Sequence, residues 1–580
     1  MNYFTDNPDL AYHIRQGIDW DRIVPLWENG FTEADGPRST AEARELYETS
    51  LTELGAFVAA EIAPHAREID EQGVRFENGQ VVQPPALLRN IEGLRRLGVM
   101  APSLAREQGG VNFPYSVSAA MLELVGRACN NTMILYAFYQ SPALLVNRFG
   151  TRDQIDRWVP RIAEGELSGS VAITEPDAGS DVGAIATTAS PDGDGWRLDG
   201  RKQFITNGCG DLCLVLARSE TGSKGLQGFS LFLVPRLDGG RDNYRVARPE
   251  KKFVIRGSAT CELAFDGSRA ELLGERGRGF AEILTFMNEA RVAVAIQALG
   301  LSQAAVCAAR AYAARRVQMG RPIARHELVA DLLFDMEAET AALRALVYRC
   351  SEIQDRIHGL EKRNDRKDAG ELRRLRRALR ERTPLAKWFG AERALWITRS
   401  AVQVHGGYGV VHEYDVERLY RDALILPIYE GTSQIQSLMS LKDQMKWALE
   451  RPWKLLSGAV CVEAAPDTTG DALRDMAIEY NRALRHVASE SLGLAGVLNA
   501  LVRRSAPSRE QLSYALLAAE RLATMLAYVR AAEALLSSAR EDKARRRLAE
   551  RFIQRSLPLV RMHGDIVRSG DRSTLEVLEA

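Results

Sequence analysis

The sequence lacks an excess of either charge. Its 580 residues include 76 lysines and arginines and 76 aspartates and glutamates. A chain with this balance is not one built mainly to bind nucleic acid or an anionic membrane. It also lacks an unbroken run of about 20 apolar residues, so we expect no transmembrane helix. Its first residues, MNYFTDNPDLAYHIRQ, match neither a secretory signal nor an arginine-rich transit peptide.

Cysteines are few and scattered. Of the seven, only Cys209 and Cys213 lie near each other in sequence, and their spacing is not CxxC. We therefore expect reduced thiols in a cytoplasmic protein, with no disulfide framework and no metal site.

Hydrophobic periodicity divides the chain into helical and β-rich parts. After an arm (1–40) of irregular polar sequence with one short amphipathic piece, apolar residues recur every three or four positions in 41–170, which predicts a helical domain. Residues 171–278 alternate in short runs such as GWRLDGRKQFITNG and FSLFLVPR, which predict an antiparallel barrel or sandwich. Helical periodicity returns in 279–450 and, beyond a break at EAAPDTTGD, in an extra domain, 451–580. The predicted fold class is therefore mainly α with a middle β-domain.

A densely charged insert, 351–382, interrupts the second helical region. Its charges are of mixed sign, so we expect a solvent-exposed helical hairpin. A basic docking patch is the alternative.

Two motifs lie at the start of the β-rich region. In VAITEPDAGSD, Gly179 allows close backbone approach to a ligand, and Thr174 and Ser180 supply hydroxyls. An ordinary glycine turn is the alternative. In QFITNG, Phe204 offers an aromatic face and Thr206 a hydroxyl, although a strand followed by an Asn-Gly turn would read the same way.

The stretch AVQVHGGYGV interrupts a helical pattern with Gly406 and Gly407. Paired glycines at that place indicate a helix terminus with exposed amides, which suits a phosphate. We expect His405 and the nearby His412 to be packed polar residues rather than catalytic ones.

The stretch LILPIYEGTSQIQ places one carboxylate, Glu430, at the end of an apolar run. Desolvation would raise the pKa of such a carboxylate toward neutrality, which suits a base that removes a carbon-bound proton. Gly431 and Thr432 begin a predicted helix, and their amides could stabilise a developing enolate. The alternative is that Glu430 is only a helix N-terminal charge.

Taken in order, TEPDAGSD, FITNG, QVHGGYG and IYEGTSQIQ resemble motifs of the acyl-CoA dehydrogenase family, over roughly residues 45–445. The resemblance implies a helical domain, a β-domain and a four-helix bundle that bind FAD. It also implies α,β-dehydrogenation of an acyl-CoA to a trans-2-enoyl-CoA. A glutamate would take the α-proton while the β-hydrogen leaves as hydride to flavin N5.

The family resemblance also places the base. Most members carry it in the YEG motif, here Glu430, whereas a minority carry it immediately before an arginine on the first helix after the β-domain. Here that arginine is Arg291 and the preceding residue is Ala290, which cannot act as a base. Glu289 is one residue off, about 100° around the helix, so we do not expect it to serve.

Other roles follow from motif positions. Thr206 would bond near flavin N5, Phe204 would cover the ring where many relatives have tryptophan, and Met319 replaces a usual aromatic residue. Arg316 and Gln403–Gly407 would meet the FAD of a neighbouring subunit, and Thr432 and Gln434 its adenosine half. The resemblance implies as FAD-binding residues Val171, Ile173, Thr174, Gly179, Ser180, Phe204, Thr206, Arg316, Gln318, Met319, Gln403, Val404, Gly406, Gly407, Thr432 and Gln434. It implies as substrate-binding residues Ser180, Asn288, Arg291, Tyr429 and Gly431.

The partners implied are an acyl-CoA substrate, electron-transfer flavoprotein and a second copy of the chain, with a dimer favoured. The segment GVRFENGQVVQPP and the added C-terminal region resemble a longer subclass, and the extension is expected to replace the second dimer of a tetramer. Val254 stands where the family has a glycine, so the path of that loop is expected to differ.

The sequence does not identify the acyl group of the substrate. Phe138, Tyr139 and Gln140 lie on the helix expected to floor the acyl pocket. They would either shorten the cavity, favouring a short, cyclic or polar acyl group, or point into the core.

Two other functions fit the same fold. A flavin oxidase or monooxygenase usually lacks the glutamate of YEG, which is present here. A non-catalytic, nucleic-acid-associated member needs a strongly basic tail. The stretch AREDKARRRLAERFIQRSLPLVRMHG instead interleaves its charges at helical spacing, which is typical of an exposed helix face.

Overall fold

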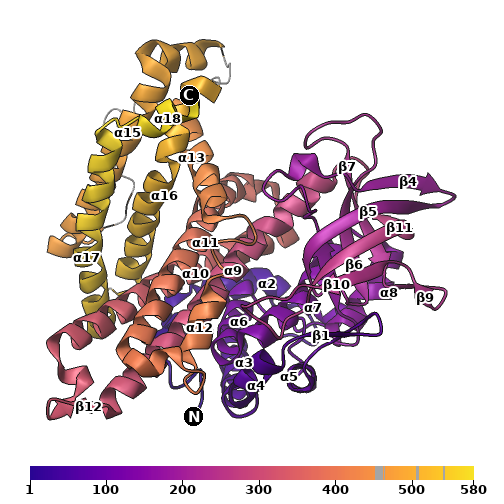
Figure 1. Cartoon of the computed structure of the whole chain (residues 1–580), viewed down its shortest axis with the longest axis horizontal. Coiled ribbons are helices and arrows are strands. Elements are labelled where there is room, and N and C mark those ends of the chain that lie inside the picture. Colours follow the sequence, from indigo (N-terminus) through magenta and orange to yellow (C-terminus); the bar gives the residue numbers. More distant parts are fainter. Residues whose placement is uncertain (451–461, 463, 504–508, 540–541, 580) are drawn as a thin grey trace. The chain divides into compact units, whose positions relative to one another are not determined.

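The computed structural model describes residues 1–450, 462, 464–503, 509–539 and 542–579. It separates into two compact units (Figure 1). Unit 1 contains Met1–Ala293 and His358–Asp365, and unit 2 contains Val294–Ile357 and Arg366–Ala580. Each unit is described separately below.

Unit 1 begins with short helices that the polar look of the arm did not predict. These are α1 (Pro8–Tyr12) and α2 (Trp20–Trp27). Trp20, Ile23 and Trp27 are buried because the amphipathic piece repeats apolar residues on one helix face. The short amphipathic piece expected in the arm is therefore helix α2, and it belongs to the core of unit 1.

Six further helices follow in unit 1, in keeping with the predicted periodicity. They are α3 (Thr40–Phe57), α4 (Ala66–Gln72), α5 (Pro85–Arg96), α6 (Tyr115–Ala128), α7 (Asn130–Phe149) and α8 (Arg152–Ala163). A hairpin of β1 (Arg75–Glu77) and β2 (Gln80–Val82) lies between α4 and α5.

The β-domain of unit 1 closes into a barrel. Its strands are β3 (Gly169–Ala172), β4 (Thr188–Asp192), β5 (Gly195–Thr206), β6 (Leu212–Arg218), β7 (Phe229–Pro235), β10 (Arg245–Pro249) and β11 (Thr260–Leu273). The small pair β8 (Leu237–Asp238) and β9 (Arg241–Asp242) lies apart. The order β10-β11-β5-β4-β6-β3 is closed by β7, which pairs with both β11 and β6.

Alternation along the strands gives the barrel two apolar faces. On β6, Leu212 and Leu214 join a cluster that includes apolar residues of α7 and α8. The intervening Cys213 and Val215 join the cluster of the other face. Successive side chains of a strand point to opposite faces, so one strand serves both cores.

Unit 2 is helical. Its helices are the latter part of α9 (Gly279–Arg315), most of α10 (Glu327–Arg363), then α11 (Ala369–His405), α12 (Val416–Ala423) and α13 (Ser433–Glu450). The hairpin of β12 (Val317–Gln318) and β13 (Arg321–Pro322) follows α9. The C-terminal helices are α15 (Thr468–Arg503), α16 (Arg509–Ser538), α17 (Lys543–Arg568) and α18 (Ser573–Glu579).

The C-terminal helices pack against the bundle within unit 2. Helices α15, α16 and α17 lie side by side, and α16 contacts both α11 and α13 (Figure 1). The ring of Phe389 on α11 meets those of Tyr528 and Phe552, with centroids 5.4 and 6.0 Å away. The extra domain thus covers an apolar face of the bundle.

The charged insert is a helical hairpin, but it is not solvent-exposed throughout. It forms the end of α10, a turn at Arg366–Asp368 and the start of α11. Glu352, Asp355 and Arg356 are buried, contrary to expectation. Buried Cys350, Ile353 and the residues after them continue the apolar stripe of α10, so helical periodicity overrides the charge count.

Two helices are long and apolar enough to cross a membrane by composition. They are Gly279–Arg315 and Leu512–Ser538. In the most apolar 18-residue segment of the first helix 72% is buried inside the structure, and in that of the second 67% is buried, as in core helices of other proteins. Within the described residues, the cysteines form no disulfide and no group of histidine, cysteine, aspartate or glutamate side chains could hold a metal ion. Cys461 lies outside the described residues.

Candidate active site

Glu430 lies in a strained turn that two buried side chains hold in place. The φ angles of Glu430 and Gly431 are 54° and 85°, in the left-handed region that side chains rarely adopt. The carbonyl of Glu430 accepts a hydrogen bond from Nε2 of Gln436 at 3.0 Å, and that of Gly431 accepts one from Nζ of Lys387 at 2.7 Å. Both donors are buried. Strain fixed in this way is typical of functional turns.

Glycine is required next to Glu430 for a steric reason as well. A Cβ at Gly431 would lie 2.5 Å from Nε2 of Gln436, the same amide that holds the turn. Helix α13 begins two residues later, as predicted. Oγ1 of Thr432 accepts the amide of Ile435 at 3.2 Å and so caps the helix, a use of this hydroxyl that the sequence did not indicate.

The Glu430 side chain is half-buried beside Tyr429. Burial raises the pKa of the Tyr429 phenol, and the negative charge of Glu430 raises it further. The phenol donates to Oε1 of Gln297. The carboxyl group therefore has a fixed aromatic neighbour and a partly desolvated setting.

Glu289 on α9, in unit 1, directly precedes Ala290, which occupies the alternative base position before Arg291. It forms an ion pair with Arg148 at 3.2 Å. Burial raises the pKa of Glu289 to about 7, although Arg148 opposes the shift. The sequence did not reveal this near-neutral carboxyl, because its burial arises only in the folded structure and its partner Arg148 lies 141 residues away along the chain. Asn288 and Arg291, both predicted to contact substrate, lie on either side of Glu289 in sequence, and the Arg291 guanidinium donates to Oδ1 of Asn288.

The turn after β3 is anchored by a buried ion pair that the sequence did not reveal. Glu175 accepts from Nζ of Lys202 at 2.9 Å and from the amides of Ala186 and Thr187 at 2.7 and 3.0 Å. Burial alone would raise the pKa of Glu175, but Lys202 and these donors lower it. Burial lowers the pKa of Lys202 to about 8. Val171 on β3 and Ile173 and Thr174 in the turn are half-buried, whereas Gly179 and Ser180 are exposed.

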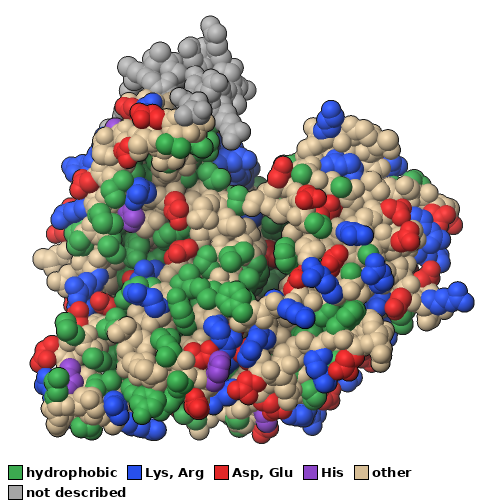
Figure 2. Space-filling model, viewed as in Figure 1, with side chains coloured by type: hydrophobic (Ala, Val, Ile, Leu, Met, Phe, Trp, Pro, Cys, Tyr) green, Lys and Arg blue, Asp and Glu red, His purple; other side chains and the backbone are tan. Residues whose placement is uncertain are grey.

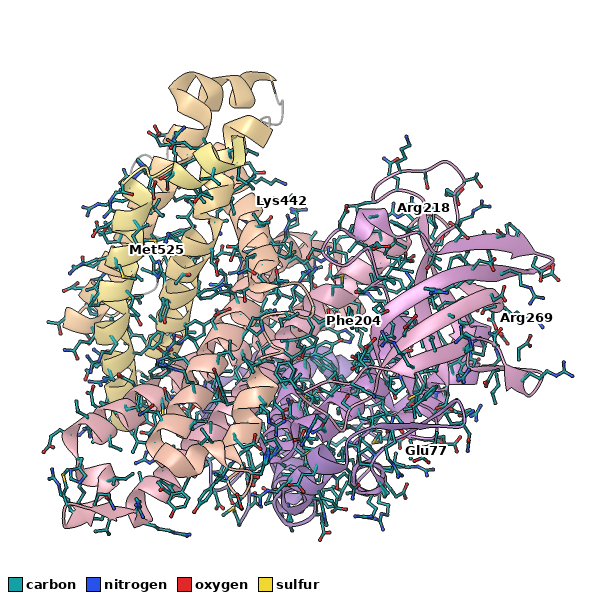
Figure 3. All side chains as sticks on the ribbon, in the orientation of Figure 1. Glu77, Phe204, Arg218, Arg269, Lys442 and Met525 are labelled. Carbon is teal, nitrogen blue, oxygen red and sulfur yellow. The ribbon has the colours of Figure 1, made fainter. Side chains whose placement is uncertain are left out.

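Phe204 is displayed at the end of β5 (Figure 3). Its side chain is 61% exposed and its φ is 60°, so an aromatic ring is presented to solvent from an unfavourable backbone conformation. Thr206, two residues on, is half-buried. The expected Asn-Gly turn follows, with Asn207 at φ 52° and its side-chain amide bonded to the carbonyl of Gly169 at 2.9 Å.

In unit 2, the predicted FAD residues Arg316, Gln318 and Met319 lie on the β12–β13 hairpin. Met319 and Gly320 have φ angles of 49° and 74°, which suit a tight two-residue hairpin turn. Met319 is 94% exposed. The guanidinium of Arg316 lies 5.7 Å from the ring centroid of Tyr408.

The glycines after Val404 close helix α11 at its C-terminus, which corrects the phosphate argument made from the sequence. The amide of Gly406 bonds to the carbonyl of Gln403. Carbonyls rather than amides are left over at this end of a helix, so it is not an anion site by dipole. Gln403, Gly406 and Gly407 are exposed and Val404 is buried.

The two histidines of this region behave differently. His405 is buried as expected, stacks on Tyr312 with centroids 4.3 Å apart, and has its pKa lowered by burial. His412 is exposed and pairs with Glu417, so the expectation that it is packed was wrong. Neither contacts Glu430 in any interaction the structure records.

Two further expectations concern the β-domain loop and α7. Val254 is buried without a left-handed backbone, and the positive φ, 46°, falls on Ile255 instead. On α7, Gln140 is buried and accepts from Ser118, whereas Phe138 and Tyr139 are half-buried. Gln140 therefore belongs to the core.

The residues present fit a large planar cofactor. Apolar side chains stand exposed at or beside the predicted FAD positions, namely Phe204, Val317, Met319, Tyr408 and Val410. The space beyond the α-carbons of Gly179 and Gly407 is open, so a ligand can approach the backbone there. Unit 1 thus offers an exposed aromatic ring and an open glycine, and unit 2 offers exposed apolar groups, an arginine and an open glycine. These are the kinds of group that a flavin dinucleotide contacts.

Three family models match the chain in order. They are the acyl-CoA dehydrogenase N-terminal domain at 44–166, the middle domain at 170–268 and the C-terminal domain at 277–444. A 3-(aryl)acrylate reductase of Clostridium sporogenes is 33% identical over 398 residues, which are 67% of this chain and 96% of that protein. A 3-methylmercaptopropionyl-CoA dehydrogenase of Ruegeria pomeroyi is 32% identical over 461 residues, 75% of each protein.

A solved structure shares the whole architecture, including the C-terminal helices. It is an acyl-CoA dehydrogenase from Bacillus anthracis complexed with FAD, with a TM-score of 0.76 and 22% identity. The match covers 97% of this chain and 93% of that one. With the family models and relatives above, this chain belongs to the acyl-CoA dehydrogenase family, as the sequence predicted, and is an oxidoreductase acting on acyl-CoA.

Proposed function

We propose that this protein oxidises an acyl-CoA thioester to a trans-2-enoyl-CoA, with Glu430 as the base. The observation that supports this most directly is the turn at Glu430, whose backbone is strained and fixed by Lys387 and Gln436. A base must be held within a fraction of an ångström of its proton to act efficiently. A surface carboxylate without a task would need no such support.

The steps assigned to the chain are few. The Glu430 carboxylate takes the proton from Cα of the substrate, and the backbone amide of Glu430 donates to the thioester carbonyl, where charge develops. Tyr429 and Gly431 flank the reacting carbons, and Arg291 lies near the CoA arm. Ser180 contacts the thioester arm from the turn after β3.

FAD is the cofactor of this family, and the residues of both units fit it. When bound, it supplies the acceptor for the β-hydrogen, which leaves as hydride. Phe204 would cover the ring, and Thr206 would donate to it. Arg316 would pair with a pyrophosphate, while Gln318, Met319, Gln403, Gly407 and Gln434 would contact the nucleotide half.

Anaerobic titration tests the proposal. The purified yellow holoenzyme is mixed with acyl-CoAs of varied length and branching, including a 3-alkylthio-propionyl and a 3-arylpropionyl thioester, and bleaching of the flavin band is followed. Glu430→Gln should bind FAD and thioester without bleaching. Glu289→Gln is the matched control and should bleach at close to the wild-type rate, because Glu289 is paired with Arg148. Bleaching by Glu430→Gln at the wild-type rate would remove Glu430 as the base.

One relative is named a reductase, so the same titration is run backwards. Chemically reduced enzyme is mixed with enoyl-CoAs, and recovery of the flavin band measures the reverse reaction. Rapid reoxidation by dissolved oxygen alone would favour a flavin oxidase instead.

We also propose a homodimer in the cytoplasm that passes its electrons to electron-transfer flavoprotein. The resemblance to the family supports the acceptor and the shared FAD site. Steady-state turnover with that flavoprotein, compared with an artificial dye, measures whether it accepts electrons.

A further inference from the structure

A cavity lies in unit 2, far from the Glu430 turn along the helices that line it. It measures about 780 Å³ and is bounded by α11, α13, α15 and α16. Along α13, its residue Trp447 is 14 positions, or about 21 Å, beyond the first residue of the helix. Along α11, Arg380 is 23 positions, or about 35 Å, before Gln403. This cavity is therefore separate from the predicted base and from the predicted FAD residues of α11.

The cavity is lined by basic side chains in excess. Among the described lining residues, seven are arginine or lysine and three are aspartate or glutamate. Arg373, Arg376, Arg377 and Arg380 follow one another at helical spacings of three and four on α11. Like charges at these spacings repel, so the stripe is unfavourable without a counter-charge.

The acidic residues of the lining are already engaged. Both carboxylate oxygens of Asp443 accept hydrogen bonds from the guanidinium group of Arg380. Glu381 accepts a hydrogen bond from Arg530 at 2.7 Å. Glu450 faces Lys446 at 3.8 Å. By contrast, Arg373 and Arg377 have no ion-pair partner among the residues that the structure describes. Two guanidinium groups are thus left to bind an anion from solution.

A buried polar group supplies an independent sign of a ligand. Tyr480 lines the cavity, is 5% exposed, and its hydroxyl has no hydrogen-bond partner within the described part of the chain. Buried hydroxyls are almost always paired, and an orphan indicates a missing partner. Trp447, half-buried, adds a flat aromatic wall. Lys442, labelled in Figure 3, lies on α13 next to this lining.

We propose that this cavity binds a small phosphorylated ligand of the nucleotide class. The α11 arginines would take the phosphates, Trp447 would stack on the planar base, and the Tyr480 hydroxyl would bond to the ligand. Arginine forks match phosphate oxygens, and aromatic faces stack on any base. Because α15 and α16 form one wall, the ligand would also couple the C-terminal domain to the bundle.

The test uses FAD-loaded enzyme, so that the flavin site is filled. Binding of ADP and of inorganic pyrophosphate is measured by calorimetry at two salt concentrations. R373A/R377A should weaken ADP binding about tenfold or more, as loss of charge-assisted bonds does, and should not alter flavin bleaching by acyl-CoA. R152A/R161A on α8 removes the same charge from an exposed helix face and should leave ADP binding unchanged. Tyr480→Phe should weaken ADP binding without changing the thermal midpoint greatly.

Three results would overturn the proposal. One is that neither ADP nor pyrophosphate binds. Another is that R373A/R377A binds ADP as tightly as the wild type, which would place the nucleotide elsewhere. The last is that duplex DNA or anionic vesicles bind through Arg373 and Arg377 while ADP does not, which would make the stripe a macromolecular surface.

Discussion

At the residue scale, the position of Glu430 depends on hydrogen bonds to the backbone of its turn. The carbonyls of Glu430 and Gly431 both accept hydrogen bonds from Gln436, and that of Gly431 also accepts one from Lys387. Lys387 is a buried cation whose ammonium group serves a backbone carbonyl. Such a group is costly to bury, so its presence beneath the turn argues for a positioning role.

Lys387→Met tests that role. The substitution keeps the length and the burial of the side chain but removes the donor to Gly431. We expect flavin reduction to slow by about 10- to 100-fold, because small displacements of a base have effects of that size. Thioester affinity and FAD content should stay near wild type, as measured by equilibrium titration and absorbance. Lys442→Met, an exposed lysine on α13, is the control. Equal rates for the two variants would show that Lys387 serves packing alone.

His358 predicts a pH dependence of stability. It lies between the rings of Trp27 and Tyr115, with centroids 4.6 and 5.8 Å away, and burial lowers its pKa to about 4. The unfolded chain, with an ordinary histidine pKa near 6.5, takes up the proton first as pH falls. Stability is thus complete above about pH 6.5 and declines toward pH 4, by about 2 kcal/mol at pH 5.

His358→Phe should remove this decline while keeping an aromatic ring in the stack. The measurement is the free energy of unfolding by urea at pH 7.5 and pH 5. The difference between the two pH values should be smaller in the variant than in the wild type. His412→Phe, at an exposed position, should leave that difference as it is. A decline that is the same in all three proteins would exclude His358 as its source.

The sequence alone predicts Glu430 as the base, but it does not show which side chains hold its turn. The apolar run and the glycine mark the position, because both act locally. The donors could not be foreseen, since Lys387 lies 44 residues before Gly431 and reaches it only in the folded bundle. The same holds for Glu289, whose partner Arg148 lies on another helix.

At the scale of elements, the turn after β3 depends on one buried ion pair. Lys202 on β5 holds Glu175, which in turn holds the amides that follow Ala184. Lys202→Met should lower the free energy of unfolding by about 3–5 kcal/mol, because it leaves a buried carboxylate without its counter-ion. Adding Glu175→Gln should recover part of that loss, as seen by urea denaturation. A single variant as stable as the wild type would contradict this account.

Some secondary-structure features could be predicted from the sequence pattern and others could not. Short β-rich runs separated by glycine, aspartate and asparagine predicted the β-domain. Strands β6 and β7 are almost continuously apolar because both of their faces are buried. The charge density of 351–382 predicted a solvent-exposed hairpin, which was wrong in part because Asp355 is fully buried within the apolar stripe of α10. The glycines at 406 and 407 marked a helix end correctly but did not reveal which end. Whether paired glycines mark the start or the end of a helix depends on which side of them the helix lies, and a short motif does not show this.

At the scale of the whole molecule, zero net charge corresponds to a mixed surface. Figure 2 shows acidic and basic side chains intermingled over the visible face. A protein that tracks a nucleic-acid backbone presents instead a broad basic face. The basic stripe of α11 is a local exception, whose exposed arginines line the cavity of unit 2.

The C-terminal helices predict the assembly state. Phe389 of the bundle is fully buried against Tyr528 and Phe552, and Arg551 of α17 pairs with Asp331 and Asp335 of α10. If this covered face is the one that relatives use to form tetramers, the full chain should be no larger than a dimer in light scattering. A chain ended after Glu450 would expose the apolar face and should form larger particles or precipitate. A chain ended after Asp571 removes only α18 and should behave as the full protein does. A tetramer of the full chain would show that the extension leaves the tetramer surface free.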